Sequence, residues 1–216
     1  MSSPSQLKLL LLGATGAVGQ QLLHQALQDS RIARVIAPTR RPLPAHPKLD
    51  NPITDFAAGE IPGYAVDAVV CALGSTIKKA GSREAFAAID RDLTIALARQ
   101  AKAAGASRFA LNSSLGASHS ANFYLRTKAE AEDGIRQIGF ASVTIVRPSL
   151  IEARRAEPRL AEAVGLAVAR LLGVLIPRRY RPVKAEAIAA TLLEAAILGR
   201  PGETVIESEA IRPPQG

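Results

Sequence analysis

The sequence predicts an α/β fold in which a doubly wound parallel sheet is covered by helices on both faces. Strand and helix patterns alternate along the 216 residues, the strand patterns are short continuous apolar runs, and a glycine-rich turn follows the first of them. Strands joined through helices form right-handed crossovers, which place the strands parallel in one sheet.

The expected strands are short and aliphatic, and the first, Leu7–Leu12, ends at Gly13. The others are expected at 33–37, near Ile53, and at 66–73, 108–111, 142–146 and 204–206. Helical spacing of apolar residues predicts helices at 18–27, 83–104, Phe123–Ile138, 160–175 and 184–198. The long helix carries its apolar stripe on Phe86, Ile89, Leu93, Leu97 and Ala101 and stops at Gly105.

The chain length predicts one domain over 1–216, with a core at about 7–150 and a helical extension on the substrate side at about 151–207. The helix expected at 160–175 is strongly apolar. It can cover the substrate pocket, form a dimer face or rest on a membrane surface, and the first is expected. The protein is expected to be a monomer or a homodimer.

The net charge of +8 comes from 27 Lys and Arg against 19 Asp and Glu. It indicates anionic partners such as a phosphorylated cofactor, but the basic residues are scattered, so nucleic acid is not an expected partner. Cys71, the single cysteine, lies in an apolar run and fits a reducing compartment. The start lacks signal-peptide features and no apolar run reaches membrane-helix length, so cytoplasm is expected.

Three glycines with the spacing G-x-x-G-x-x-G, Gly13, Gly16 and Gly19, lie between the first strand and the first helix. Glycines at these places allow a tight turn, close approach of backbone amides to a pyrophosphate, and close packing of helix on strand. The start of the helix then offers free N–H groups and a partial positive charge to the anion. The turn therefore predicts a dinucleotide-binding Rossmann fold.

The end of the second expected strand bears on the choice of dinucleotide. A site for NAD(H) usually has an acidic residue there, which binds the ribose hydroxyls. This sequence has Thr39, Arg40 and Arg41 instead. Guanidinium groups form charge-assisted hydrogen bonds with phosphate, so the pair favours NADP(H) over NAD(H).

Tyr124 and Lys128 are four residues apart on an expected helix, and they therefore lie on the same face, one turn apart. A neighbouring ammonium favours the phenolate form of a tyrosine, which suits a proton donor to a carbonyl group that is being reduced. Ser114, after the preceding strand, is placed to bind the same carbonyl oxygen. The three histidines are isolated from one another, so no metal site is expected.

This order of residues resembles the short-chain dehydrogenase/reductase superfamily, in particular its atypical NAD(P)-binding branch that includes the Tat-interacting oxidoreductases. The resemblance runs from about residue 7 to 151, and its most specific portions are 71–74, 80–81, 89–92, 112–117, 124–128 and 147–148. One departure is Asp90, which stands where the best-known members have an asparagine in the long helix. Another is the short distance in sequence from Ser114 to Tyr124.

The resemblance implies a role for each matching residue. Thr15, Gly16, Ala17 and Val18 would line the pyrophosphate, and Arg40 with Arg41 the 2′-phosphate. Leu73 and Gly74 would flank the middle of the cofactor, Pro148 the nicotinamide, and Asp55 with Phe56 the adenine. Tyr124 would donate the proton, and Lys128 would also hold the nicotinamide ribose.

Two hypotheses follow from the sequence. The first is an NADP(H)-dependent oxidoreductase that transfers a hydride between nicotinamide and a small carbonyl or alcohol substrate. The second is a non-catalytic NADP(H)-binding regulator or redox sensor. An epimerase with bound NAD is a third reading, against which Arg40 and Arg41 argue.

Overall fold

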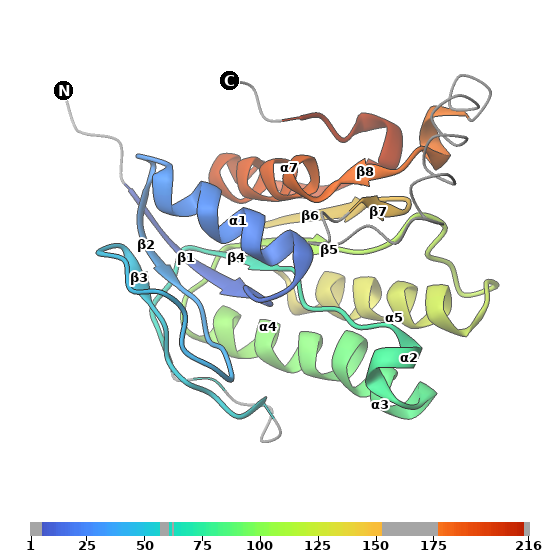
Figure 1. Ribbon diagram of the computed structural model, residues 1–216, viewed down its shortest axis with the longest axis horizontal. Coiled ribbons are helices and arrows are strands. Elements are labelled where there is room, and N and C mark those ends of the chain that lie inside the picture. The colour runs from blue at the N-terminus through green and yellow to red at the C-terminus, as the bar shows by residue number, and fades with distance from the viewer. Residues whose placement is uncertain (1–5, 57–60, 62, 153–176, 214–216) are drawn as a thin grey trace, which may run out of the picture.

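The computed structural model describes residues 6–56, 61, 63–152 and 177–213. Within these residues a seven-stranded parallel sheet has the strand order β3-β2-β1-β4-β5-β6-β9 (Figure 1). The strands are β1 (Leu7–Leu12), β2 (Ile32–Ile36), β3 (Leu49–Asp50), β4 (Ala68–Cys71), β5 (Arg108–Asn112), β6 (Ser142–Arg147) and β9 (Gly202–Glu207). The predicted doubly wound parallel sheet is confirmed.

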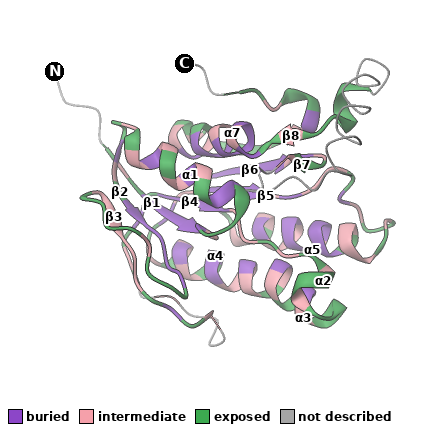
Figure 2. Cartoon of the chain, viewed as in Figure 1, coloured by how far each residue is buried: buried purple, intermediate pink, exposed green. Residues whose placement is uncertain are grey.

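Helices cover both faces of the sheet, with their buried residues turned inward (Figure 2). One face carries α1 (Ala17–Gln28) and α7 (Ala185–Leu198), and the other carries α4 (Thr94–Ala103) and α5 (Phe123–Ile138) (Figure 1). Two short helices, α2 (Ile77–Ala80) and α3 (Arg83–Ala87), precede α4. A separate parallel pair is formed by β7 (Ile151–Glu152) and β8 (Val183–Lys184).

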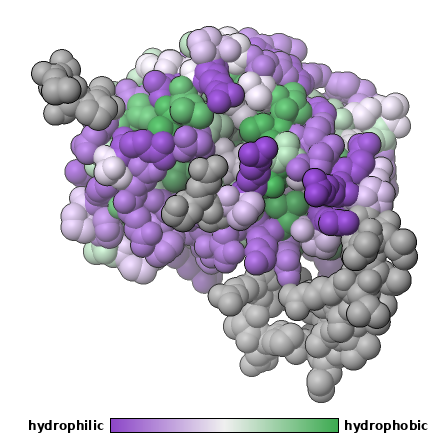
Figure 3. Space-filling view, turned by 90° about the horizontal axis from the view of Figure 1, so that it is seen from above, coloured by the Kyte–Doolittle hydropathy of each residue, from purple (hydrophilic) through white to green (hydrophobic). Residues whose placement is uncertain are grey.

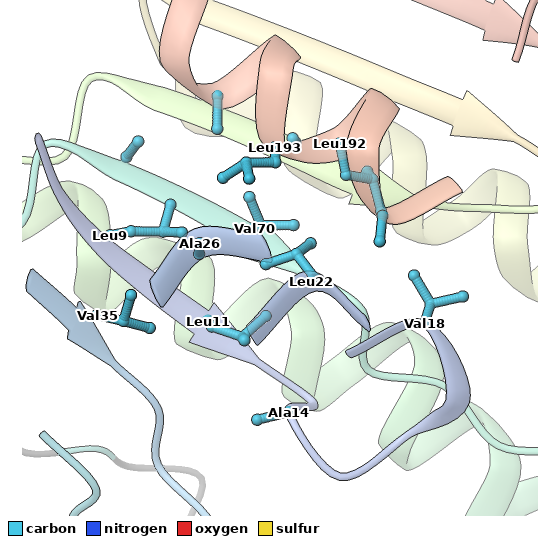
Figure 4. Packing of buried hydrophobic residues seen from close by; sticks show 14 of the residues in the cluster. Leu9, Leu11, Ala14, Val18, Leu22, Ala26, Val35, Val70, Leu192 and Leu193 are labelled. Carbon is cyan, nitrogen blue, oxygen red and sulfur yellow. The ribbon is translucent and has the colours of Figure 1, made fainter. Parts of the chain in front are cut away.

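Aliphatic side chains fill the space between α1, α7 and the sheet, in a chain that has five Phe, three Tyr and no Trp. Leu22 from α1, Leu192 from α7 and Leu9 from β1 each have no exposed surface, and they belong to one cluster (Figure 4). Burying a leucine of this kind contributes about 1.5–3 kcal/mol. The opposite layer adds a tilted ring pair, Phe109 and Phe140, whose centroids are 5.1 Å apart.

The C-terminal residues complete the main sheet. β9 pairs with β6 over its whole length, from Ser142 against Gly202 to Arg147 against Glu207. The helix before it, α7, packs against α1 and against the strands. The helix expected at 160–175 lies outside the described residues.

The long helix expected at 83–104 contains a wide turn. A π-helical segment, Ala88–Leu93, lies between α3 and α4. Because a π turn holds more residues than an α turn, the buried stripe shifts by one position. Ile89 and Leu93 are therefore only half-buried, whereas Asp90 and Thr94 are 2% and 1% exposed. The predicted stripe is wrong in this stretch and correct at Phe86, Leu97 and Ala101.

The third strand lies slightly earlier than expected. It spans Leu49–Asp50, and Ile53 contributes only an isolated bridge to Thr39. Pro52 interrupts the ladder because proline has no N–H group. The side-chain amide of Asn51 donates to the carbonyl oxygen of Ala37 instead, at 2.6 Å.

The burial of Cys71 leads to a prediction of low thiol reactivity. Cys71 is fully buried on β4, and this burial raises the pKa of its thiol to about 11. Since the thiolate is the reactive form, we expect no alkylation of the native protein by iodoacetamide at pH 8, and rapid alkylation in urea. Mass spectrometry after timed quenching measures this. Equal rates in the two conditions would contradict the prediction.

Candidate functional site

The predicted site residues follow the carboxyl ends of parallel strands, and they therefore lie along one edge of the sheet. Gly13 follows β1, and Ala72 follows the neighbouring strand β4. The chain leaves β1 and β4 toward opposite faces, which makes this the switch point where ligands bind in doubly wound folds. The turn and the loop touch here: the Ala72 amide donates to the Leu12 carbonyl at 2.8 Å.

The glycine turn requires glycine at two of its positions. Gly13 has a φ of +87°, and a Cβ atom there would lie 2.6 Å from the backbone of Ala72. A Cβ at Gly19 would collide with the carbonyl oxygen of Gly13. These contacts draw the first turn of α1 tightly against β1 and β4.

The start of α1 is open to a ligand. Gly16 is its N-cap residue, no side chain caps the helix, and its first turn carries no acidic residue. Thr15, Gly16 and Ala17 are exposed. An uncapped helix start surrounded by small residues leaves backbone N–H groups for an anion, so this cradle fits a dinucleotide pyrophosphate.

Arg40 and Arg41 both lie exposed beyond the end of β2. The turn that carries them is held by Thr39, whose hydroxyl donates to the Arg41 carbonyl at 2.6 Å and accepts from the Asn51 amide at 2.7 Å. Within the described ranges, neither guanidinium takes part in a recorded ion pair. The arrangement leaves two cations exposed at the carboxyl end of β2.

Further predicted residues follow the strands of the same sheet. Leu73 and Gly74 follow β4, and Gly74 is exposed. Pro148 follows β6, and its carbonyl accepts the Leu115 amide at 2.8 Å, which ties the loop after β5 to β6. Asp55 and Phe56 lie beyond β3 at the far side of β2.

Tyr124 and Lys128 lie in the first two turns of α5. The helix begins at Asn122, whose side chain accepts the Leu125 amide at 3.1 Å. The Tyr124 ring stacks on the fully buried ring of Phe86, with centroids 5.2 Å apart, and the Lys128 Nζ lies 6.0 Å from the Tyr124 centroid. Phe86 thus braces the tyrosine from α3, a contact that the sequence did not reveal.

The two serines after β5 differ in their surroundings. Ser113 is buried, and its hydroxyl donates to Glu132 at 2.5 Å. Ser114 is half-buried at the edge. Of the two, Ser114 is the one with surface available to a ligand. The Asn112 Oδ1 atom is buried without a hydrogen-bond partner within the part of the chain described.

Glu132 anchors α5 beneath these residues. It is fully buried and accepts from Arg147 at 3.0 and 2.6 Å, in addition to Ser113. Arg147 also donates to Glu207 on β9 at 3.1 Å. One carboxylate therefore joins α5 to the ends of β5 and β6, and through Arg147 to β9. A carboxylate so deeply buried requires such partners.

Asp90 is a polar residue near the site whose burial the apolar stripe of the long helix did not predict. It forms a buried ion pair with Lys128, whose Nζ lies 2.5 Å from Oδ1. Phe86, Asp90 and Thr94 are spaced four apart and are all buried, and this common spacing is the signal in the sequence that points to an inward-facing Asp90.

Other groups lie away from this edge. His119 is exposed and binds Asp133 at 2.7 Å, further along α5 than Tyr124. Among the described residues, no group of three metal-binding side chains is found, and no helix is long and apolar enough to cross a membrane.

A groove of about 780 Å³ runs beside α7 between Asp29 and Thr204, at the opposite end of α1 from the glycine turn. The face that carries α1 and α7 is mainly hydrophilic with separate apolar patches (Figure 3).

The fold and the glycine turn define a dinucleotide-binding α/β domain. A family model described as NAD(P)H-binding matches residues 13–168, and the chain belongs to this family. Protein fmp52, mitochondrial, of Aspergillus niger is 33% identical over 218 residues, covering 93% of this chain and 92% of that protein. Protein HTATIP2 of Rattus norvegicus is 33% identical over 164 residues, 71% of this chain and 66% of that protein. The resemblance to the Tat-interacting branch is confirmed.

Solved structures share the fold at low sequence identity. WbmH of Bordetella bronchiseptica, in complex with NAD+, has a TM-score of 0.70 at 17% identity, covering 94% of this chain and 76% of that chain. The UDP-Glc/GlcNAc 4-epimerase of Campylobacter jejuni has a TM-score of 0.66 at 14% identity, covering 94% and 81%. The protein therefore has the fold of NAD(P)-binding oxidoreductases and epimerases.

The expectation of a cytoplasmic protein is wrong. The matching proteins of Aspergillus niger, Emericella nidulans and Candida albicans all carry the word mitochondrial in their names. The sequence reasoning used a lone cysteine and the lack of a secretory signal. Neither feature separates the cytoplasm from another reducing compartment.

The collision at Gly19 leads to a testable prediction. We expect Gly19→Ala to lower the free energy of unfolding by about 1–3 kcal/mol, because the new methyl group meets backbone rather than a mobile side chain. The substitution by itself favours a helix, so any loss of stability reports the contact with Gly13. Urea unfolding measures it.

Gly63→Ala is the matched control, since a Cβ atom at Gly63 has no neighbour within 4 Å. Equal stability of the two variants would contradict the close packing of α1 on the turn.

Proposed function

We propose that the protein is an NADP(H)-dependent oxidoreductase that interconverts a small carbonyl compound and the corresponding alcohol. The observation that carries this proposal is the common edge. An uncapped helix start, two exposed guanidinium groups and a Tyr–Lys pair all follow the carboxyl ends of neighbouring strands. The family match supports a nicotinamide dinucleotide as the ligand of this edge.

The preference for NADP(H) rests on the end of β2. Arg40 and Arg41 are exposed there, and no carboxylate stands in their place to bind the ribose hydroxyls. The NAD bound in the solved structures of MoeE5 and WbmH belongs to those proteins. The 2′-phosphate is the group that would distinguish this chain's coenzyme from theirs.

A bound nicotinamide coenzyme supplies or accepts the hydride of such a reaction. In the direction of reduction, Tyr124 donates a proton to the carbonyl oxygen, and Ser114 donates a hydrogen bond to the same oxygen. The Lys128 ammonium lies 6.0 Å from the Tyr124 ring centroid and faces the negative charge that develops on the tyrosine oxygen. Phe86 restricts the ring to one orientation by stacking on it.

The arginine pair provides a test of coenzyme choice. We expect Arg40→Ala together with Arg41→Ala to weaken NADPH binding at least about tenfold, because a charged hydrogen bond contributes about 1.5–3 kcal/mol. NADH binding should change by less than about twofold, since NADH has no 2′-phosphate. Calorimetric titration with both coenzymes measures the ratio.

Arg34→Ala is the control, because Arg34 is an exposed arginine of the neighbouring β2 strand that pairs with Asp50. If the double variant loses NADH and NADPH affinity equally, the assignment of the 2′-phosphate site is refuted.

Tyr124→Phe tests the catalytic role. We expect the rate of coenzyme oxidation with a panel of small aldehydes and ketones to fall by about 10²–10⁴-fold, because the proton donor is lost while the ring still stacks on Phe86. Affinity for NADPH should be preserved. Tyr180→Phe, which removes the hydroxyl of an exposed tyrosine, is the control. A parent protein that binds NADPH without any turnover would favour a non-catalytic regulator.

A further inference from the structure

Asp90 faces two hydrogen-bond donors that come from different parts of the chain. Its Oδ2 accepts the backbone amide of Ser75, directly after Gly74, at 2.9 Å. Its Oδ1 lies 2.5 Å from the Nζ of Lys128 on α5. The carboxylate has no exposed surface, and the lysine side chain is 8% exposed. The wide turn Ala88–Leu93 brings Asp90 to this place.

The chemistry of the two neighbours explains an aspartate at this position. Both are donors only, and an ionised carboxylate is the side chain of this size that accepts on both of its oxygens. An asparagine would turn its NH2 group toward either the Ser75 amide or the Lys128 ammonium. The asparagine of the best-known short-chain reductases therefore does not suit this environment.

The ion pair lies immediately behind the loop that follows β4. A Cβ atom on Gly74 would stand 3.6 Å from the Asp90 Oδ1 and 3.7 Å from the Lys128 Nζ. The ammonium has three N–H groups, and its contact with Oδ1 occupies one of them. Within the described part of the chain, no other polar partner of the Lys128 ammonium is found, so the remaining N–H groups are available to a ligand at the edge.

We propose that Asp90 is a positioning residue, which locks the Lys128 ammonium against the Gly74–Ser75 loop so that the ammonium binds the ribose hydroxyls of the nicotinamide coenzyme. This inference rests on the proposed function. Removing the negative charge frees a buried ammonium to turn away from the loop, since a buried charge without a partner is costly. The variant therefore loses coenzyme affinity because the Lys128 ammonium is displaced, and not because the protein is less well folded.

A double-mutant cycle on coenzyme binding tests the proposal. NADPH dissociation constants are measured by calorimetry for the parent, Asp90→Asn, Lys128→Met and the protein with both changes. We expect Asp90→Asn to weaken binding about tenfold to a hundredfold. Combined with Lys128→Met, it should weaken binding no further than Lys128→Met alone, because the residue acts through the lysine.

Controls separate this role from a general loss of structure. Asp92→Asn removes a carboxylate two residues along the same π turn, 57% exposed and paired with Arg91, and should leave NADPH affinity unchanged. Asp90→Glu keeps the charge and should recover part of the lost affinity. Circular dichroism checks that each variant is folded, and if Asp90→Asn does not fold, Asp90→Ser, which also removes the charge, takes its place in the cycle.

Two results overturn the inference while leaving the proposed function intact. One is an Asp90→Asn protein that binds NADPH within about twofold of a parent that binds it well. The other is a double variant whose loss of NADPH affinity equals the product of the losses in the two single variants. This result would assign Asp90 a role in the fold that is independent of Lys128. A parent protein that binds neither NADPH nor NADH overturns both the inference and the proposed function, and this outcome is read from the parent alone.

Discussion

The close contact between the glycine turn and the backbone after β4 is the constraint on which the rest of the site depends. Leu12 on β1 pairs with Cys71 on β4, so the segments that follow these two strands leave the sheet at adjacent points. A Cβ atom at Gly13 would lie 2.6 Å from the backbone of Ala72. A side chain at this position would push α1 away from the sheet. The backbone amides at the start of α1 would move with the helix. The core beneath α1 and the opening above it are therefore set by the same glycines.

The other part of the candidate site is formed by α5, which contributes one row of side chains. Tyr124, Lys128 and Glu132 are spaced four apart and so lie along one face. The last two are buried and ion-paired, Lys128 to Asp90 and Glu132 to Arg147. Burying charges is costly, and partners on other elements offset the cost only when α5 sits at one position. The charges thus specify where the tyrosine lies relative to the strand ends.

Structural neighbours at 14–17% identity share the fold of this chain, and one of them is a UDP-Glc/GlcNAc 4-epimerase. Function in such folds is decided by side chains at the carboxyl edge. In this chain those side chains include two arginines after β2 and an aspartate in place of an asparagine, and the proposals on coenzyme binding depend on them.

The sequence alone determined the parallel sheet, the glycine turn and the Tyr–Lys spacing, because these depend on local patterns: apolar runs, glycines at fixed intervals and a separation of four residues. The tertiary structure decided which polar groups meet. Asn51 replaces the amide missing at Pro52, and Phe86 braces Tyr124. Asp90 turns inward to pair with Lys128 because a π turn displaces the stripe read from the sequence. Such pairings join residues far apart in the chain, and local periodicity carries no information about them.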